Sequence, residues 1–238
     1  MNESENATSR PIVLDDVKVE LSRGDVLKAM KVRKTPESLL TLVDDVLVRC
    51  LAVARPKAMF TVAYVTSHTD SGVTLGGEAF NSKVLSQNLN GIQRVFPFVA
   101  TCGVEVDSVA LSGTDMMTTY CAETVRLLLL QQARRRLDTY LKETYSLAQL
   151  SRMAPGSLPD WPLPEQVPLF RLLGDTEGLV GVRLTDKHLM LPIKSVSGIA
   201  FPTEVRFESC QLCPRAVCEG RRAPYDPEKA ARYGVAAS

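Results

Sequence analysis

Three cysteines fall within nine residues, in the run Cys210-Gln-Leu-Cys213-Pro-Arg-Ala-Val-Cys218. Zinc ions and iron–sulfur clusters both prefer thiolate ligands, and a short loop that binds one gains structure from the metal. The spacing therefore predicts a metal-binding loop, and the alternative is a compact loop of reduced cysteines. An iron–sulfur cluster could use these three cysteines alone, whereas a closed zinc site needs a fourth ligand. The candidates for that ligand are Cys50, Cys102, Cys121, His68 and His188.

Composition places the chain among ordinary globular proteins and argues against a nucleic-acid or membrane partner. Its 238 residues are 45% hydrophobic, which is enough for a proper core, and the formal net charge is +1. Residues 1–10 are polar, lack the apolar core of an export signal, and are expected to be disordered. The apolar stretch 125–130 is far shorter than the roughly 20 residues that span a bilayer. We expect a cytoplasmic protein whose six cysteines bind metal or are buried as thiols.

Apolar periodicity and turn residues predict short strands that are separated irregularly by helices. The predicted strands are 12–21, 59–66, 95–102, 180–184 and 189–191, with a polar loop at 67–77 and a polar turn at 192–198. The predicted helices run from Thr35-Pro36 to Arg55, over 82–89, from Asp115 past Leu141, and over 165–173, with a proline-rich irregular stretch from Ala154. Arg134 to Arg136 are expected to form a solvated face of the third helix. The pattern indicates an α+β fold in which helices pack on a curved, mainly antiparallel sheet.

Four segments between residues 152 and 198 carry a resemblance to a known family. They are Arg152-Met-Ala-Pro-Gly156, residues 166–173, Val182-Arg-Leu-Thr185, and Ser195-Val-Ser-Gly198. Their order and spacing resemble the activation domain of cobalamin-dependent methionine synthase. With the cysteine loop and Arg221-Arg-Ala-Pro-Tyr225, the whole chain looks like the stand-alone activation proteins that accompany split methionine synthases in some anaerobic bacteria.

The resemblance implies that the chain binds S-adenosylmethionine and acts in reductive reactivation of a cobalamin-dependent methionine synthase or related corrinoid protein, from Co(II) to methyl-Co(III). The partner would carry the cobalamin, and a ferredoxin or flavodoxin could supply the electron. Cofactor chemistry of this kind asks the protein mainly for alignment, and a guanidinium such as that of Arg152 could clamp a carboxylate. The residues that the resemblance assigns to the ligand are Arg152, Ala154, Gly156, Ser195, Ser197, Gly198, Ala200 and Phe201.

The chain departs from the family at two places. Ser157 stands where the family has an aromatic residue after Pro-Gly, and Ala200-Phe201 replace the aromatic pair that follows the second loop. The acidic residue that contacts the ligand in the family is not identifiable, and Asp70, Asp107 and Asp115 are candidates. Trp161 could line the groove, face a partner or pack against its own loop.

These observations divide the chain into a disordered N-terminus (1–10), an activation-like domain (11–208) and a Cys-rich metal-binding segment (209–238). A metal or iron–sulfur cluster bound at Cys210, Cys213 and Cys218 could be structural or could carry electrons. The first functional hypothesis is a reactivation subunit that binds S-adenosylmethionine. The second is a metal-stabilised assembly or scaffold subunit that keeps the fold without a ligand site. A free-standing methyltransferase is disfavoured, because the glycine-rich strand-to-helix turn of that fold is not present.

Overall fold

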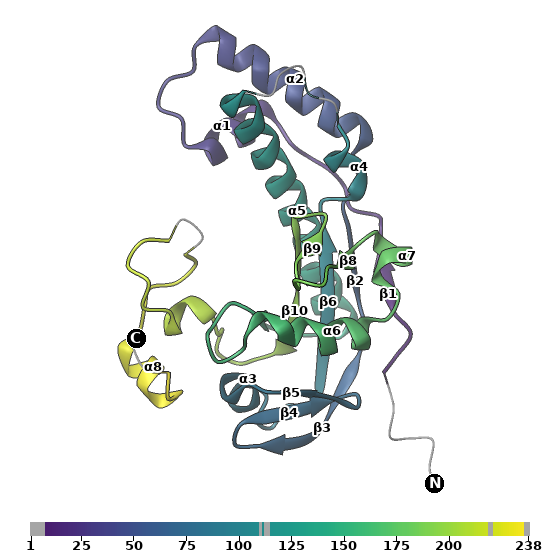
Figure 1. The fold of residues 1–238 in the computed structure, drawn as a ribbon, viewed down its shortest axis with the longest axis vertical. Helices are drawn as coiled ribbons and strands as arrows, with labels where there is room; N and C mark the ends of the chain where they lie inside the picture. The colour runs from purple at the N-terminus through teal and green to yellow at the C-terminus, as the bar shows by residue number, and fades with distance from the viewer. Residues whose placement is uncertain (1–7, 110, 112–114, 219–220, 236–238) are drawn as a thin grey trace.

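The protein is described by a computed structural model, which covers residues 8–109, 111, 115–218 and 221–235. Helices stand on both sides of a central sheet, and the C-terminal segment lies beside this body (Figure 1). In the described residues, no helix is long and apolar enough to cross a membrane. Of the predicted disordered stretch 1–10, residues 1–7 lie outside the described part, and the backbone N–H of Ser9 donates to the carbonyl of Val62 at 3.0 Å.

The central sheet is antiparallel at every described pairing. Its main path runs β1-β2-β6-β3-β4-β5, and β10 pairs with both β6 and β7. The strands are β1 (Ile12–Leu14), β2 (Lys57–Phe60), β3 (Ala63–Thr69), β4 (Gly72–Leu75), β5 (Glu78–Phe80), β6 (Arg94–Thr101), β7 (Leu150–Met153) and β10 (Ser195–Pro202). A separate two-stranded sheet joins β8 (Arg183–Leu184) to β9 (Met190–Leu191).

Two hydrophobic clusters use alternate residues of the same central strands. In β6, Phe96, Phe98 and Ala100 belong to the first cluster, whereas Val95 and Val99 belong to the second. Because successive side chains of a strand point to opposite faces, the clusters lie on the two faces of the sheet. The first face is covered by α1 (Arg23–Met30), α2 (Glu37–Val53), α4 (Val104–Asp107) and α5 (Met116–Thr144).

The second face is covered by shorter elements and by part of the C-terminal segment. These are α3 (Lys83–Asn88), α6 (Gln166–Leu173), α7 (Thr176–Val180), η2 (Ser209–Leu212) and α8 (Pro227–Arg232), and the short η1 (Leu163–Glu165) directly precedes α6. Trp161 is fully buried there and meets Phe80 edge to face at 6.2 Å. Packing against its own loop and neighbours is therefore the observed role of this side chain.

The long periodic helices and the β6 strand agree with the sequence predictions. The helix α5 begins after Asp115, whose carboxylate accepts from the N–H groups of Met117 and Thr118. The hydroxyl of Ser82 caps α3 by accepting from the N–H of Leu85. The helix α2 begins at Glu37, so Pro36 is its N-cap and not its first helical residue. The helix α1 was not predicted, although Ser22 and Asp25 form a reciprocal capping box at its start.

Several loop and strand predictions were wrong. The predicted strand 12–21 is a strand only as far as Leu14, because β2 offers three register partners to it. The predicted loop 67–77 is a hairpin, and the strand predicted at 180–184 opens with the last residue of α7. Of the predicted turn 192–198, residues 192–194 lie outside any strand, whereas residues 195–198 form the first half of β10, since pairing with β6 satisfies their backbone.

Candidate functional site

The two motifs that carry the family resemblance lie side by side in the sheet. Arg152 of β7 is the register partner of Ala200 in β10, and Met153 is the partner of Ile199. Gly198 allows this approach, because a Cβ atom built on it would stand 2.4 Å from the carbonyl oxygen of Met153. The glycine of the second motif therefore sets how closely the first motif can pack.

The alternation of β10 divides its motif residues between the two faces of the sheet. Val196 and Ala200 belong to the first hydrophobic cluster, on the side of α5, whereas Ile199 and Phe201 belong to the second. Arg152 contacts α5 and so lies on the first side. Phe201 is 1% exposed on the opposite side. The structure therefore brings Arg152, Gly198 and Ala200 together and turns Phe201 away from them.

The two serines of the second motif use their hydroxyl groups inside the protein. Ser195 Oγ lies 3.0 Å from Thr101 Oγ1, and Ser197 Oγ donates to Gln166 Oε1 at 3.2 Å. The amide nitrogen of Gln166 donates in turn to the backbone carbonyl of His188 at 3.0 Å. Ser197 is buried, so this chain of hydrogen bonds fastens α6 to the central strand.

Arg152 is held by an acidic residue that the sequence analysis did not single out. Its Nε donates to Asp138 Oδ1 at 3.1 Å, and its Nη2 forms a second bond to Asp138 Oδ2. Both side chains are largely buried, with 19% and 26% of their surfaces exposed. A bidentate pair of this kind fixes the plane of the guanidinium, so α5 positions Arg152.

A second arginine lies one helical turn before Asp138, on the same side of α5. The Nε atom of Arg134 is buried and has no hydrogen-bond partner among the described residues. Burial lowers the pKa of Arg134, and the positive charges of Arg152 and Arg222 lower it further, while Asp138 and Glu208 act in the opposite sense. The predicted solvated face therefore holds for Arg135, which is exposed, and not for Arg134.

The loop after Arg152 makes a tight turn onto its own second half. Gly156 has φ of +80°, and its backbone N–H donates to the carbonyl of Trp161 at 2.7 Å. The carbonyl of Ala154 accepts from the backbone and the hydroxyl of Ser157. The hydroxyl of Ser157 also lies 3.5 Å from that of Ser209, so this loop touches the C-terminal segment.

The C-terminal cysteines and the Gly156 loop line the same cavity. Its volume is about 710 Å³, and Gly156, Ser157, Cys210, Cys213 and Cys218 all contribute to its walls, together with Arg222. A cavity of this volume lies within the range of small-molecule sites. The structure thus joins the first predicted ligand loop to the predicted metal loop.

The three cysteines differ in their surroundings but do not form a metal site as they stand. Burial opposes ionisation of Cys210, yet hydrogen bonds from the backbone of Arg222 and Ala223 and from the Arg222 side chain outweigh it, so the pKa of Cys210 is lowered. Within the described ranges, however, no group of three or more His, Cys, Asp or Glu side chains is arranged to hold a metal ion. The predicted metal stays a prediction from the sequence.

The remaining predicted ligands lie elsewhere. Cys50, Cys102 and Cys121 are buried in the first cluster, and burial raises the pKa of Cys102 to about 12 and that of Cys121 to about 11. His68 lies beside Ser86, with 3.3 Å between Nδ1 and the hydroxyl. The Nδ1 of His188 is buried without a described partner.

The three candidate acids have other surroundings as well. Asp115 caps α5, Asp107 lies 3.5 Å from Arg126, and Asp70 lines a polar pocket with His68. The acidic residue that meets Arg152 is Asp138. The only signal for Asp138 in the sequence was its four-residue spacing from Arg134 on a helix.

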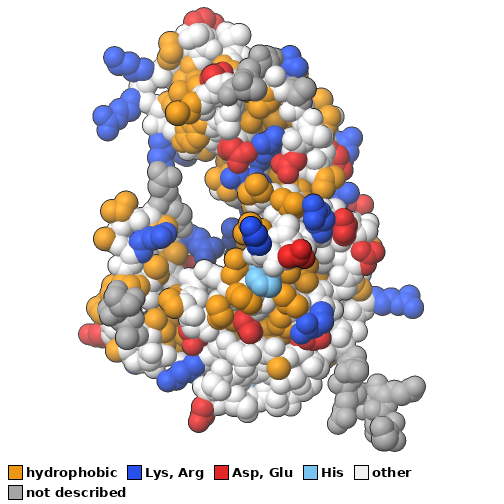
Figure 2. All heavy atoms as spheres, viewed as in Figure 1, with side chains coloured by type: hydrophobic (Ala, Val, Ile, Leu, Met, Phe, Trp, Pro, Cys, Tyr) orange, Lys and Arg blue, Asp and Glu red, His pale blue; other side chains and the backbone are white. Residues whose placement is uncertain are grey.

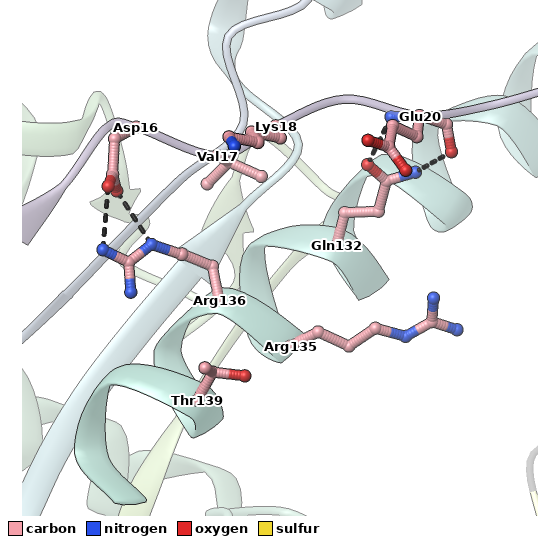
Figure 3. Close-up of a pocket in the computed structure, with 8 residues that line it drawn as sticks. All are labelled: Asp16, Val17, Lys18, Glu20, Gln132, Arg135, Arg136 and Thr139. Carbon is pink, nitrogen blue, oxygen red and sulfur yellow. Dashed lines mark hydrogen bonds and ion pairs between the residues drawn. The ribbon is translucent and has the colours of Figure 1, made fainter. Parts of the chain in front are cut away.

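Another cavity lies on α5, between this helix and the extended segment 16–20. Arg136 binds Asp16 through two hydrogen bonds, and the amide of Gln132 binds both backbone groups of Glu20 (Figure 3). Arg135 lines this cavity and points away from the paired residues in the same view. These contacts fasten the N-terminal segment to α5.

Comparison with known proteins identifies the fold. No protein-family model matches the sequence, and no curated protein sequence matches it. Among solved structures, the chain matches the crystal structure of the MetH reactivation domain bound to AdoHcy, with a TM-score of 0.54 and 15% sequence identity. The match covers 88% of this chain and 86% of that chain. It confirms the predicted resemblance and the α+β fold with its mainly antiparallel sheet.

Proposed function

We propose that this chain binds S-adenosylmethionine and serves in the reductive reactivation of a cobalamin-dependent methionine synthase or a related corrinoid protein. The observation that carries the proposal is the register of β7 and β10, which pairs Arg152 of the first motif with Ala200, two residues after the Ser-Val-Ser-Gly motif ends. The fold is similar to that of the reactivation domain, whose crystal structure contains AdoHcy, and the sequence resemblance links the two motifs to the same family.

The ligand would lie at the end of β7, on the side of the sheet that α5 covers. Arg152, fixed by Asp138, would bind the carboxylate of the methionine part, while Ala154 and Gly156 would offer backbone groups. Ser195, Ser197, Gly198, Ala200 and Phe201 would shape the strand under this loop. These residues bind and align the sulfonium methyl group, and the cobalamin of the partner supplies the nucleophile.

The reaction needs one electron from outside the chain. A ferredoxin or flavodoxin would supply this electron to the partner's cobalamin, whose reduced cobalt would accept the methyl group of S-adenosylmethionine, with S-adenosylhomocysteine as the released product. Methyl transfer from the sulfonium is favourable because the leaving group is a neutral thioether. No step is assigned to Cys210, Cys213 or Cys218.

Calorimetric titration of the full chain with S-adenosylmethionine and with S-adenosylhomocysteine tests the proposal. We expect saturable binding of both ligands, and no turnover without a corrinoid protein. Variant Ala200→Glu places a carboxylate beside Arg152 and should abolish binding, provided that circular dichroism shows an unchanged fold. Absence of binding by the unaltered chain would refute the proposal.

The alternative is an assembly or scaffold subunit that keeps the fold without the ligand site. The specific observation in its favour is that Asp138 and Gln166 already satisfy Arg152 and Ser197, and that Phe201 is buried. A chain that binds a corrinoid protein in a pull-down assay but does not bind S-adenosylmethionine would support the alternative.

The metal prediction is tested on the same preparation. One iron–sulfur cluster or one zinc ion per chain after anaerobic purification would support a site at the three C-terminal cysteines, and a Cys213→Ser variant should then lose the metal. A metal content that this variant leaves unchanged would contradict the prediction. The result bears on the cysteine loop alone, because S-adenosylmethionine binding is measured separately.

A further inference from the structure

The side of α5 that faces β7 and the C-terminal segment gathers arginine side chains from three parts of the chain. Arg134 comes from α5, Arg152 from β7, and Arg222 follows the cysteine loop. The space-filling view shows a hollow between the C-terminal segment and the body, with basic side chains around it (Figure 2). Three guanidinium groups therefore share one region of the molecule.

Two carboxylates, those of Asp138 and Glu208, lie near these three positive charges. Asp138 takes the Nε and Nη2 groups of Arg152, and Glu208 lies 3.2 Å from the Nε of Arg222 and also pairs with Arg206. Arg134 forms no ion pair with a carboxylate of the described residues, and its buried Nε has no hydrogen-bond partner. A buried donor without a partner is costly, so its presence calls for an explanation.

The two arginines that follow Arg134 in α5 have the usual surroundings of an arginine side chain, which are an ion pair or solvent. Arg136 forms a bidentate pair with Asp16 through its Nε and Nη2 groups, and Arg135 is exposed (Figure 3). Only the first of these three consecutive arginines is drawn into the protein without a partner of its own. Burial beside like charges lowers the pKa of Arg134, and a bound anion would offset that effect.

We propose that Arg134 is a carboxylate-binding residue, which together with Arg152 forms an oxyanion subsite for the amino-acid end of the ligand. The inference rests on the proposed function, because it takes S-adenosylmethionine as the ligand. Since Asp138 occupies two donors of Arg152, that guanidinium has only part of its fork left for a carboxylate, and Arg134 supplies the missing donors.

The test compares the unaltered chain and three variants in their binding of two ligands. Arg134→Gln and the matched control Arg135→Gln are titrated with S-adenosylmethionine and with decarboxylated S-adenosylmethionine, which lacks only the carboxylate. We expect Arg134→Gln to weaken binding of S-adenosylmethionine about tenfold or more, the effect of losing one charge-assisted hydrogen bond. It should leave binding of the decarboxylated ligand unchanged, and Arg135→Gln should change neither. Arg134→Lys, which keeps the charge, should recover part of the loss.

The outcomes separate this inference from the function on which it rests. If the unaltered chain binds S-adenosylmethionine and Arg134→Gln binds it equally well, the subsite is wrong and the proposed function stands. An equal loss for both ligands would also overturn the subsite, since the effect would then not depend on the carboxylate. If the unaltered chain binds neither ligand, both proposals fail. Thermal melting of each variant guards against loss of fold, and Arg134→Gln should melt normally because it breaks no described hydrogen bond.

Discussion

Gly198 should be one of the least replaceable residues of this chain, and Gly198→Ala measures how tightly the two motifs are packed. A Cβ atom at this position would lie 2.4 Å from the carbonyl oxygen of Met153 and 3.2 Å from the ring of Phe98. Ordinary contacts begin near 3.4 Å, so the Met153 carbonyl would have to retreat by about 1 Å. That oxygen belongs to the backbone of β7 and cannot rotate away.

The loss of stability follows from this displacement. Overpacking of a well-packed site costs roughly 1–3 kcal/mol, and moving β7 weakens ladder hydrogen bonds that contribute about 1 kcal/mol each. We therefore expect Gly198→Ala to destabilise the protein by roughly 3 kcal/mol, which for a chain of this length corresponds to a Tm about 10 °C lower. Because β7 leads into the Arg152 loop, binding of S-adenosylmethionine should weaken as well.

Gly24→Ala is the matched control. Gly24 lies in the first turn of α1, where an added Cβ would meet only Ser22 Oγ, at 3.6 Å. Alanine also favours helices more than glycine does, so this variant should melt at or slightly above the temperature of the unaltered chain. Circular dichroism melts of the three proteins decide the matter, and equal melting temperatures for Gly198→Ala and the unaltered chain would refute the packing argument.

Three further predictions concern ionic and thiol groups. Asp138→Asn should cost about 1–3 kcal/mol in urea unfolding, because it leaves the largely buried Arg152 without its anion; an unchanged midpoint would contradict this. Cys210 should react with iodoacetamide at a lower pH in the folded chain than in the urea-unfolded chain, because folding lowers its pKa below the usual 9.0. A lowered pKa means that the thiolate stabilises the fold above the unfolded pKa, and that this contribution is lost as the pH falls through the folded value. A thiol reagent at pH 8 should modify the three cysteines of the C-terminal loop and spare the three buried ones until the chain unfolds.

Local sequence patterns predicted the elements that local interactions determine. The periodicity and capping residues of α5 and α3 were sufficient, because apolar spacing and an N-cap side chain act within a few residues. The hairpin of β3 and β4 was missed, because its polar and glycine-rich segment gains its structure from pairing between the strands. The first half of β10 was missed for the same reason, since Ser195 to Gly198 is mostly polar and ends in glycine, and it gains its structure from pairing with β6.

In the candidate site, too, local patterns indicated some residues, and contacts between distant segments determined the others. Arg152 and Gly198 were found through a resemblance of short motifs, and the sheet register explains why these motifs occur together. The pairing of Arg152 with Asp138 links a strand to a helix, and no local pattern indicates it. Arg134 was assigned to a solvated face because consecutive arginines on a helix usually are solvated, but the fold buries part of it near Arg152 and Arg222.

The sharing of β2, β6 and β10 between the two hydrophobic clusters has a consequence for unfolding. Neighbouring residues of one strand belong to different clusters, as Phe98 and Val99 do in β6, so neither cluster can open while the other stays intact. A chain with two separate cores often melts in two stages, but here the same strands contribute side chains to both cores. Calorimetry should therefore record one transition, with a van't Hoff enthalpy equal to the calorimetric enthalpy.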